Sequence, residues 1–308
     1  ADEFRKNKVE AGTAEDFGGN VDWLKEVSRI GFSHQHTLTL SGGNSENNFR
    51  VSADYRNANG IDRRSEREEI GARASINHNT KNGLFTFSVN IAPRLVKSKS
   101  SDWHVFQYAI EANPTSPIFD PQDPSRYFSF MGQRADRNPV ELIKTELSDN
   151  EYKLLDWDGT VRLNILPGLN TQVTYSNQYV GSFGGYFLPS TNTKTNMSEA
   201  NRSYGQTDKS AVEWLKAMAG YSWQSITNSG FSATNKQFAN DGTTYNSLGQ
   251  GEWGLEEGHD GTSSYKNNSK LIAFFGRLNY DYMSKYLLTL SLRYEGSSKF
   301  GINNKWGY

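Results

Sequence analysis

The chain has 308 residues and a formal net charge of −1, with 35% hydrophobic and 13% aromatic residues and no cysteine. The balanced charge provides no basic surface for nucleic acid, and the lack of cysteine excludes disulfides and thiolate metal sites. A mean hydropathy of −0.73, with no apolar run of about 18 residues, excludes membrane-spanning helices. A polar average with many aromatic residues suits an outer-membrane β-barrel and a secreted β-sandwich alike.

The N-terminal region contains one short predicted helix. Residues 1–21 are polar, contain no apolar signal-peptide core and are interrupted by Gly18 and Gly19. Residues 21–30 predict one or two helical turns, with Asp22 near the start. The apolar residues on one face of this helix are Trp23, Leu24, Val27 and Ile30. We expect that face to pack locally.

Four segments then alternate apolar and polar residues with a period of two: 37–41, 49–56, 70–77 and 85–91. This alternation is typical of strands with one apolar and one polar face. The turns at 44–48 and 79–83 contain the Asn and Gly residues of tight hairpins, and 57–68 is a charged loop. The region is therefore predicted to be an antiparallel meander.

A long loop rich in proline and aromatic residues is predicted at 93–150, within a single β-domain over 1–308. After it, alternation returns in five segments: 161–165, 172–179, 219–223, 272–280 and 286–295. Tight turns are predicted at Pro167-Gly168 and at 283–285. Short and long connections thus alternate along the chain. Outer-membrane barrels sort their connections into short periplasmic turns and long extracellular loops, whereas a soluble sandwich has no reason to do so.

The segment 286–295 shows the strand design most clearly. Leu288, Leu290 and Leu292 share a face, with Tyr286 and Tyr294 at its two ends. About nine to eleven residues suffice for a tilted strand to cross a bilayer, and aromatic rings suit both membrane interfaces. We expect a transmembrane strand. The residues predicted to lie at the membrane interfaces are Tyr55, Tyr175, Tyr280, Tyr286 and Tyr294.

One region departs from the regular pattern. A long polar loop is expected from about Gly184, and the up-and-down alternation requires two strands before Gln224. Residues 209–224 have room for little more than one strand, and 211–218 also fit a helix with Val212 and Met218 on one face. Our hypothesis is that residues are missing before position 217.

No set of residues predicts catalysis, so we expect neither enzymatic activity nor a cofactor. His34 and His36 share a face, but no acidic residue is near them in sequence, so a metal site is disfavoured. The pairs Asp156/Asp158 and Asp120/Asp123 lack the spacing of a calcium-binding EF-hand, and turn capping is the favoured interpretation.

The aromatic residues of the 93–150 loop are the candidate ligand-binding residues. The candidates are Trp103, Phe106, Tyr108, Tyr127 and Phe128. Flat rings stack on sugar faces or hold peptide side chains, and loops carry many binding sites. The competing interpretation, that these rings fold the loop into a small core of its own, is favoured.

Several blocks resemble one family. They are Asn20-Val-Asp-Trp-Leu-Lys-Glu-Val, His36-Thr-Leu-Thr-Leu-Ser-Gly-Gly, Ala219-Gly-Tyr-Ser-Trp-Gln, Lys285-Tyr-Leu-Leu-Thr-Leu-Ser-Leu-Arg-Tyr-Glu-Gly-Ser-Ser-Lys-Phe-Gly and Asn303-Asn-Lys-Trp-Gly. Their sequence and order resemble the barrel of SusC/RagA-like TonB-linked outer-membrane proteins. The resemblance implies a barrel of about 22 strands, of which this chain would supply roughly strands two to eleven. The signal peptide, the plug domain and the C-terminal half of the barrel would then lie outside it.

The resemblance also implies a function at the outer membrane of a Gram-negative bacterium. It implies import of oligosaccharides or peptides too large for porins, with a SusD-like surface lipoprotein as a lid and TonB acting through the plug. A passive porin-like channel and a soluble glycan-binding β-sandwich remain alternatives, and a hydrolase is the least favoured. The expected lumen residues Arg50, Asp54, Arg73 and Arg293 are of mixed sign and do not identify the cargo.

Overall fold

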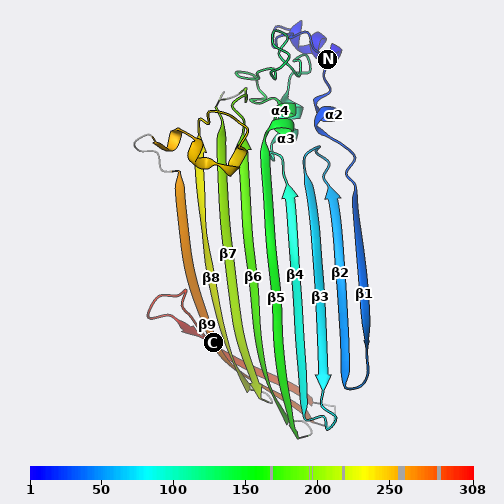
Figure 1. Ribbon diagram of the computed structural model, residues 1–308, viewed down its shortest axis with the longest axis vertical. Helices are drawn as coiled ribbons and strands as arrows, with labels where there is room; N and C mark the ends of the chain where they lie inside the picture. The colour runs from blue at the N-terminus through cyan, green and yellow to red at the C-terminus, as the bar shows by residue number, and fades with distance from the viewer. Residues whose placement is uncertain (167–168, 194, 196, 217–218, 256–260, 283–285) are drawn as a thin grey trace.

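The computed structural model describes residues 1–166, 169–193, 195, 197–216, 219–255, 261–282 and 286–308; at 214–216, 255, 278–282 and 286–287 it describes the backbone only. Eleven antiparallel strands form one sheet in sequence order (Figure 1). They are β1 Ser33–Gly43, β2 Asn47–Asn59, β3 Glu66–Asn79, β4 Phe85–Lys99, β5 Leu147–Leu166, β6 Leu169–Leu188, β7 Glu199–Lys216, β8 Ala219–Lys236, β9 Thr262–Tyr282, β10 Tyr286–Ser297 and β11 Trp306–Gly307.

The helices gather at one end of the sheet, which we call the loop end, and the short hairpins lie at the other, the hairpin end (Figure 1). The helices are α1 Asp2–Phe4, the π-helical turn Arg5–Val9, α2 Trp23–Val27, α3 Val105–Glu111 and α4 Pro139–Thr145, with 3₁₀ turns η2 Thr244–Asn246, η3 Leu248–Gln250 and η4 Trp253–Leu255. Among the described helices, none is long and apolar enough to cross a membrane.

The strand register aligns the apolar positions of neighbouring strands into one continuous face. Val51 pairs with Ala74, Ile76 pairs with Val89, and Val161 pairs with Val173. Large apolar side chains on this apolar face are 41% to 77% exposed: Leu38, Leu40, Val51, Ile76, Val89, Ile91, Val161, Val173, Leu288, Leu290 and Leu292. A water-soluble protein rarely exposes so much contiguous apolar surface, but in a bilayer the lipid chains cover it. The described strands form a single sheet, which contradicts the sandwich alternative.

The strands extend well beyond the apolar face. β5 and β6 have 20 residues each, about twice the nine to eleven needed to cross a bilayer. On β5 the apolar face includes Val161 and Trp157, whereas the same-face positions nearer the loop end are Lys153 and Glu151. The wall therefore continues past the apolar face, and on β5 the same side of the sheet becomes charged there.

This polar extension corrects two sequence-based boundaries. β4 continues to Lys99 and β5 begins at Leu147, so the predicted 93–150 loop is in fact 100–146. Pro93 is tolerated inside β4 because the β3–β4 pairing is interrupted at 72–73 and 92–93, where its missing N–H would otherwise be needed. Backbone pairing held these polar segments in the sheet although no apolar alternation marked them.

The region 199–236 also differs from expectation. β7 and β8 pair along their full lengths, from Glu199 with Lys236 to Lys216 with Ala219. The helical interpretation of 211–216 is wrong, and two strands fit without additional residues. The reason is that the polar stretch 201–210, expected to be loop, is strand.

The predicted turns have mixed outcomes. The hairpins at 44–46 and 80–84 are confirmed, with Gly83 at a φ of 65°, a conformation that suits glycine. The turns at Pro167-Gly168 and at 283–285 lie outside the described residues. The predicted helix is confirmed as α2, whose N-cap Asp22 accepts a hydrogen bond from the Lys25 amide, whereas α1 was not predicted.

Candidate functional site

The loop end of the sheet carries a small folded unit, the cap, made of residues 1–30 and the connection 100–146. Its core is apolar and buried: Trp23, Val27, Val105, Ala109, Ala112, Phe130, Ala135, Val140 and Ile143. Trp23 packs edge-to-face on Phe130, with ring centroids 5.4 Å apart. Three short helices from two distant segments thus share one core. Leu24 and Ile30 of the expected apolar face remain exposed.

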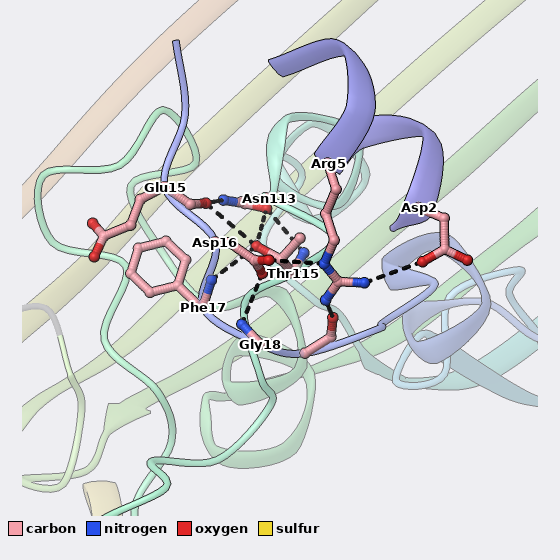
Figure 2. A network of polar contacts seen from close by, with 9 residues as sticks. Asp2, Arg5, Glu15, Asp16, Phe17, Gly18, Asn113 and Thr115 are labelled. Atoms are coloured by element: carbon pink, nitrogen blue, oxygen red, sulfur yellow. Dashed lines mark hydrogen bonds and ion pairs between the residues drawn. The ribbon is translucent and has the colours of Figure 1, made fainter. Parts of the chain in front are cut away.

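A strap formed by residues 15–23 holds the N-terminal segment against the long connection (Figure 2). The buried Thr115 hydroxyl accepts from the Phe17 amide at 3.1 Å, and the Trp23 indole donates to the Asn113 carbonyl at 3.0 Å. Gly19 allows the close approach, because a Cβ there would lie 2.6 Å from the Thr115 carbonyl oxygen.

Arg5 braces the strap from the outside. Its guanidinium donates to the Asp16 carboxylate at 2.9 Å and to the Gly19 carbonyl at 2.6 Å (Figure 2). The bond from Arg5 lowers the pKa of Asp16 below its ordinary value.

Buried carboxylates attach the cap to the wall. Glu141 on α4 accepts hydrogen bonds from the Thr193 amide at 2.9 Å and the Thr193 hydroxyl at 2.6 Å. Glu146 accepts from the Tyr186 hydroxyl of β6 at 2.6 Å and lies 3.7 Å from Arg137. Burial raises the pKa of both Glu146 and Tyr186. These contacts fix the cap over β5 and β6.

The five loop aromatics predicted to bind ligand fall into two groups. Phe106, Tyr127 and Phe128 pack against the cap core. Trp103 and Tyr108 instead both contact the His104 ring, and Trp103 is 84% exposed. The first group therefore supports the cap fold, and the second presents a ring to solvent; ligand binding by any of the five stays a prediction.

The polar face of β2 to β4 carries a charged network that contains Asp54, one of the predicted lumen residues, and two more, Arg50 and Arg73, line the hollow beside it. Arg94 bridges the Asp54 and Glu69 carboxylates at 3.1 Å and 3.0 Å. Gly71 leaves room for this bridge, since a Cβ there would lie 2.9 Å from Asp54 Oδ1. A hollow of about 520 Å³ beside it is lined by Arg50, Ser52, Asp54, Arg73, Arg94 and Asp156. Arg293, also expected in the lumen, pairs elsewhere with Glu295 at 2.7 Å.

The predicted interface tyrosines lie on the apolar face where the structure describes them. Tyr175 packs against Trp157, Tyr294 stacks on Trp306, and the Tyr55 hydroxyl donates to Glu68. The side chains of Tyr280 and Tyr286 lie outside the described residues. Contact with a membrane interface stays a prediction for all five.

The remaining histidine and aspartate predictions have different outcomes. The His34 and His36 rings lie 5.3 Å apart, and no metal-ligand cluster occurs among the described side chains. Asp120 and Asp123 accept hydrogen bonds from nearby turn amides, as expected. The turn-capping interpretation is wrong for Asp156 and Asp158, which lie inside β5.

Sequence reasoning missed a second aromatic cluster. It lies on the opposite side of the wall from the charged network of Arg94, Asp54 and Glu69. Phe183, Tyr204 and Phe231 come from β6, β7 and β8 and are direct cross-strand neighbours. Only the strand register aligns them, so no local sequence pattern reveals the cluster.

The fold and the two faces of its wall define the class: a wall segment of an outer-membrane-type β-barrel with a folded cap at its loop end. No family model matches the chain. The TonB-dependent receptor SusC of Bacteroides thetaiotaomicron is 23% identical over 98% of this chain and 32% of its own length. The TonB-dependent receptor P3 of Formosa agariphila is 24% identical over 94% of this chain and 30% of its own length.

Solved structures agree on the fold. The RagAB peptide transporter matches 95% of this chain and 35% of the compared chain, with a TM-score of 0.74 and 18% identity. The chain is thus a homologue of TonB-dependent receptors, and it spans about a third of the length of the curated relatives it matches. Those relatives are named as receptors, not as enzymes.

Proposed function

We propose that this chain forms part of the barrel wall of an outer-membrane importer that takes up large nutrients with energy supplied through TonB. The observation that carries the proposal is the continuous apolar face opposite a polar, charged face along one antiparallel sheet. Such a wall separates lipid from an aqueous passage. The homology to TonB-dependent receptors supports the energised mode of transport.

The cap is the proposed meeting point with cargo and lid. Besides Trp103, the 100–146 connection of the cap exposes the large apolar residues Ile110, Phe119 and Met131, which are 70%, 46% and 66% exposed. Exposed apolar side chains on a folded, anchored unit are typical of protein contacts. We propose that a SusD-like lipoprotein closes over this surface and that oligosaccharides or peptides enter beneath it. RagAB, which shares the fold, is a peptide transporter.

The polar hollow lined by Arg50, Arg73 and Arg94 supports a passage on this face of the sheet. A passive channel would use the same wall, so it remains the second candidate. Dependence on TonB distinguishes the two, because diffusion through a passive pore requires no coupling to an energised inner membrane.

The test uses the intact parent gene in its native host. Uptake of labelled oligosaccharides and peptides is measured in wild-type cells, in cells lacking the parent protein and in cells lacking TonB. We expect uptake of one cargo class to fall to background in both mutants. Uptake that needs the parent protein but not TonB would contradict the importer and indicate a passive channel.

A pair of substitutions tests the role of the cap. Trp103→Ala removes the exposed cap ring, and Trp157→Ala removes a ring of the apolar face far from the cap. We expect the first variant to weaken uptake or lid retention about tenfold, as loss of an interface aromatic commonly does, and the second to leave both unchanged. Equal effects would argue against a role for Trp103.

A further inference from the structure

The missed aromatic cluster lines a shallow hollow on the wall. The rings of Phe183, Tyr204 and Phe231 form a row, with centroids 5.2 Å and 5.0 Å apart. By strand alternation they occupy the same side of the sheet as Val173, Val212 and Trp223, which is the apolar face. The hollow beside them has a volume of about 990 Å³. The row thus faces away from the charged polar face.

The row lies toward the loop end of the wall, past polar side chains that interrupt the apolar face. Phe183 is about 26 Å along β6 beyond Tyr175, at about 3.3 Å per residue, which is about 20 Å of height for a strand tilted by about 35–45°. The apolar band of an outer-membrane barrel is only about 25 Å tall in total. Between the two positions the same face carries polar side chains, with Asn177 bonded to Asp208 and Ser210. The rings therefore lie toward the outer edge of the apolar face, on the loop-end side of these polar side chains.

A folded loop packs beside the hollow. Tyr245 of η2 lies over Phe183, with ring centroids 6.0 Å apart, and its hydroxyl donates to Asp149 at 2.8 Å. Burial and this bond raise the pKa of Tyr245 to about 12. Beside it, Phe187, Ala200 and Phe238 form a small buried core. The lining of the hollow comes from the strands of the wall, and the 237–255 segment packs beside it against Phe183, at one end of the row.

The charge of the hollow is positive where it meets the rings. The Arg202 guanidinium lies 5.2 Å from the Phe183 ring centroid and 5.1 Å from that of Tyr204. Its Nε is buried without a hydrogen-bond partner, and among the described residues Arg202 forms no ion pair. Lys266 also lines the hollow, whereas Lys153 is neutralised by Glu151 at 3.0 Å.

We infer that this hollow binds an anionic saccharide, one bearing phosphate or carboxylate groups, of the kind that covers the outer leaflet just above the lipid. A row of flat rings suits stacking against sugar faces, and an unpaired guanidinium held on those rings suits a phosphate or carboxylate. The volume falls in the range of about 300–1,000 Å³ found for small-ligand sites. The inference rests on the proposed location in the outer membrane.

The test measures binding to the purified full-length parent protein in detergent. The probes are rough-type lipopolysaccharide, its released phosphorylated core oligosaccharide, lipid A alone and a neutral oligosaccharide of similar size. We expect the first two to bind and the last two not to. If the released core oligosaccharide and the intact lipopolysaccharide bind with equal affinity, the site also accepts free anionic polysaccharide. If the intact lipopolysaccharide binds more tightly, the ligand comes from the outer leaflet.

Variants locate the site. Arg202→Gln is expected to weaken binding of the core oligosaccharide at least about tenfold, because it removes a charge-assisted contact. Tyr204→Ala is expected to weaken it, whereas Tyr204→Phe keeps the ring and the affinity. The control is Arg162→Gln, which makes the same charge change on the opposite face, where Arg162 bonds to Gln172.

Three results would overturn the inference: no binding of any anionic saccharide, equal binding of lipid A alone, or wild-type affinity in Arg202→Gln. A change of oligomeric state in that variant without saccharide binding by the wild type would also overturn it and indicate a protein contact instead. TonB-dependent uptake is measured in the same strains. Normal uptake without saccharide binding rejects only this site, whereas binding without TonB-dependent uptake rejects only the importer.

Discussion

The cap and the apolar face of the wall treat the same residue types in opposite ways. In the cap, Val27 and Leu142 are fully buried, whereas Leu38 and Leu292 on the wall are 77% and 68% exposed. The cap minimises its apolar surface against water, and the wall offers its apolar surface to lipid. The same chain therefore folds against two solvents, water at the cap and lipid at the apolar face. The boundary between water and lipid crosses β5 to β8.

The largest effect is expected from Trp23→Ala in the cap. This change removes the ring that packs on Phe130 and the indole bond to Asn113. Truncation of a buried aromatic costs about 3–5 kcal/mol, enough to unfold the cap while the wall stays in the membrane. Proteolysis of intact cells should then cleave residues 1–30 rapidly. Leu38→Ala on the wall is the control and should leave the cleavage rate unchanged.

A charge placed on the apolar face tests the other side of the comparison. Val89→Arg puts a cation at an exposed apolar position of β4, and Ser88→Arg puts it on the opposite face of the same strand. At the midplane of a bilayer the first should cost about 2–4 kcal/mol. Urea unfolding in lipid vesicles measures both. Similar costs for the two variants would contradict the assignment of the faces.

Loss of a contact that attaches the cap to the wall is expected to have an intermediate effect on stability. Glu141→Ala leaves the Thr193 amide and hydroxyl without their buried partner. Such a loss costs about 1–3 kcal/mol, and Glu141→Gln should cost less because its amide oxygen still accepts one bond. Hydrogen exchange at the Thr193 amide is the measurement. Unchanged protection in Glu141→Ala would show that this contact does not hold the cap.

The smallest effect is a pH dependence. Because burial raises the pKa of Glu146 above its ordinary value of 4.5, the folded cap favours the protonated acid. The contribution of Glu146 to the stability of the folded cap is fully present below about pH 4.5 and is lost as pH rises through the raised pKa. The pH dependence contributed by Asp123 has the opposite sign, because hydrogen bonds from Ser125 lower the pKa of Asp123. Glu146→Gln should flatten the rise in cap proteolysis with pH, whereas Asp123→Asn should not.

Sequence reasoning succeeded where one face of a strand meets lipid. The alternation of Leu288, Leu290 and Leu292 is confirmed by their exposure on β10, because a single apolar face imposes a period of two. It failed above the membrane, where both faces of β7 contact water and the alternation is lost. There only backbone pairing defines the strand, and pairing partners leave no local pattern.

The candidate sites were less accessible from sequence for a related reason. Trp23 was assigned to a local apolar face, but its contact Phe130 lies far along the chain. Phe183, Tyr204 and Phe231 meet only through the register of three strands. Contacts between residues that are distant in sequence decide both clusters, whereas periodicity describes only neighbours.

The most direct test of the central claim is cysteine labelling, since residues 1–308 contain no cysteine and any cysteine elsewhere in the full-length protein can be replaced by serine. Trp103→Cys in the cap, Ser45→Cys in the β1–β2 hairpin and Val89→Cys on the apolar face are placed in the full-length protein and treated with a membrane-impermeant maleimide. In cells that lack the proposed lid lipoprotein, we expect Trp103→Cys to label on intact cells, Ser45→Cys to label only after the outer membrane is opened, and Val89→Cys to resist both. Labelling of Val89→Cys from water, or of Ser45→Cys on intact cells, would contradict a lipid-facing wall with its cap outside.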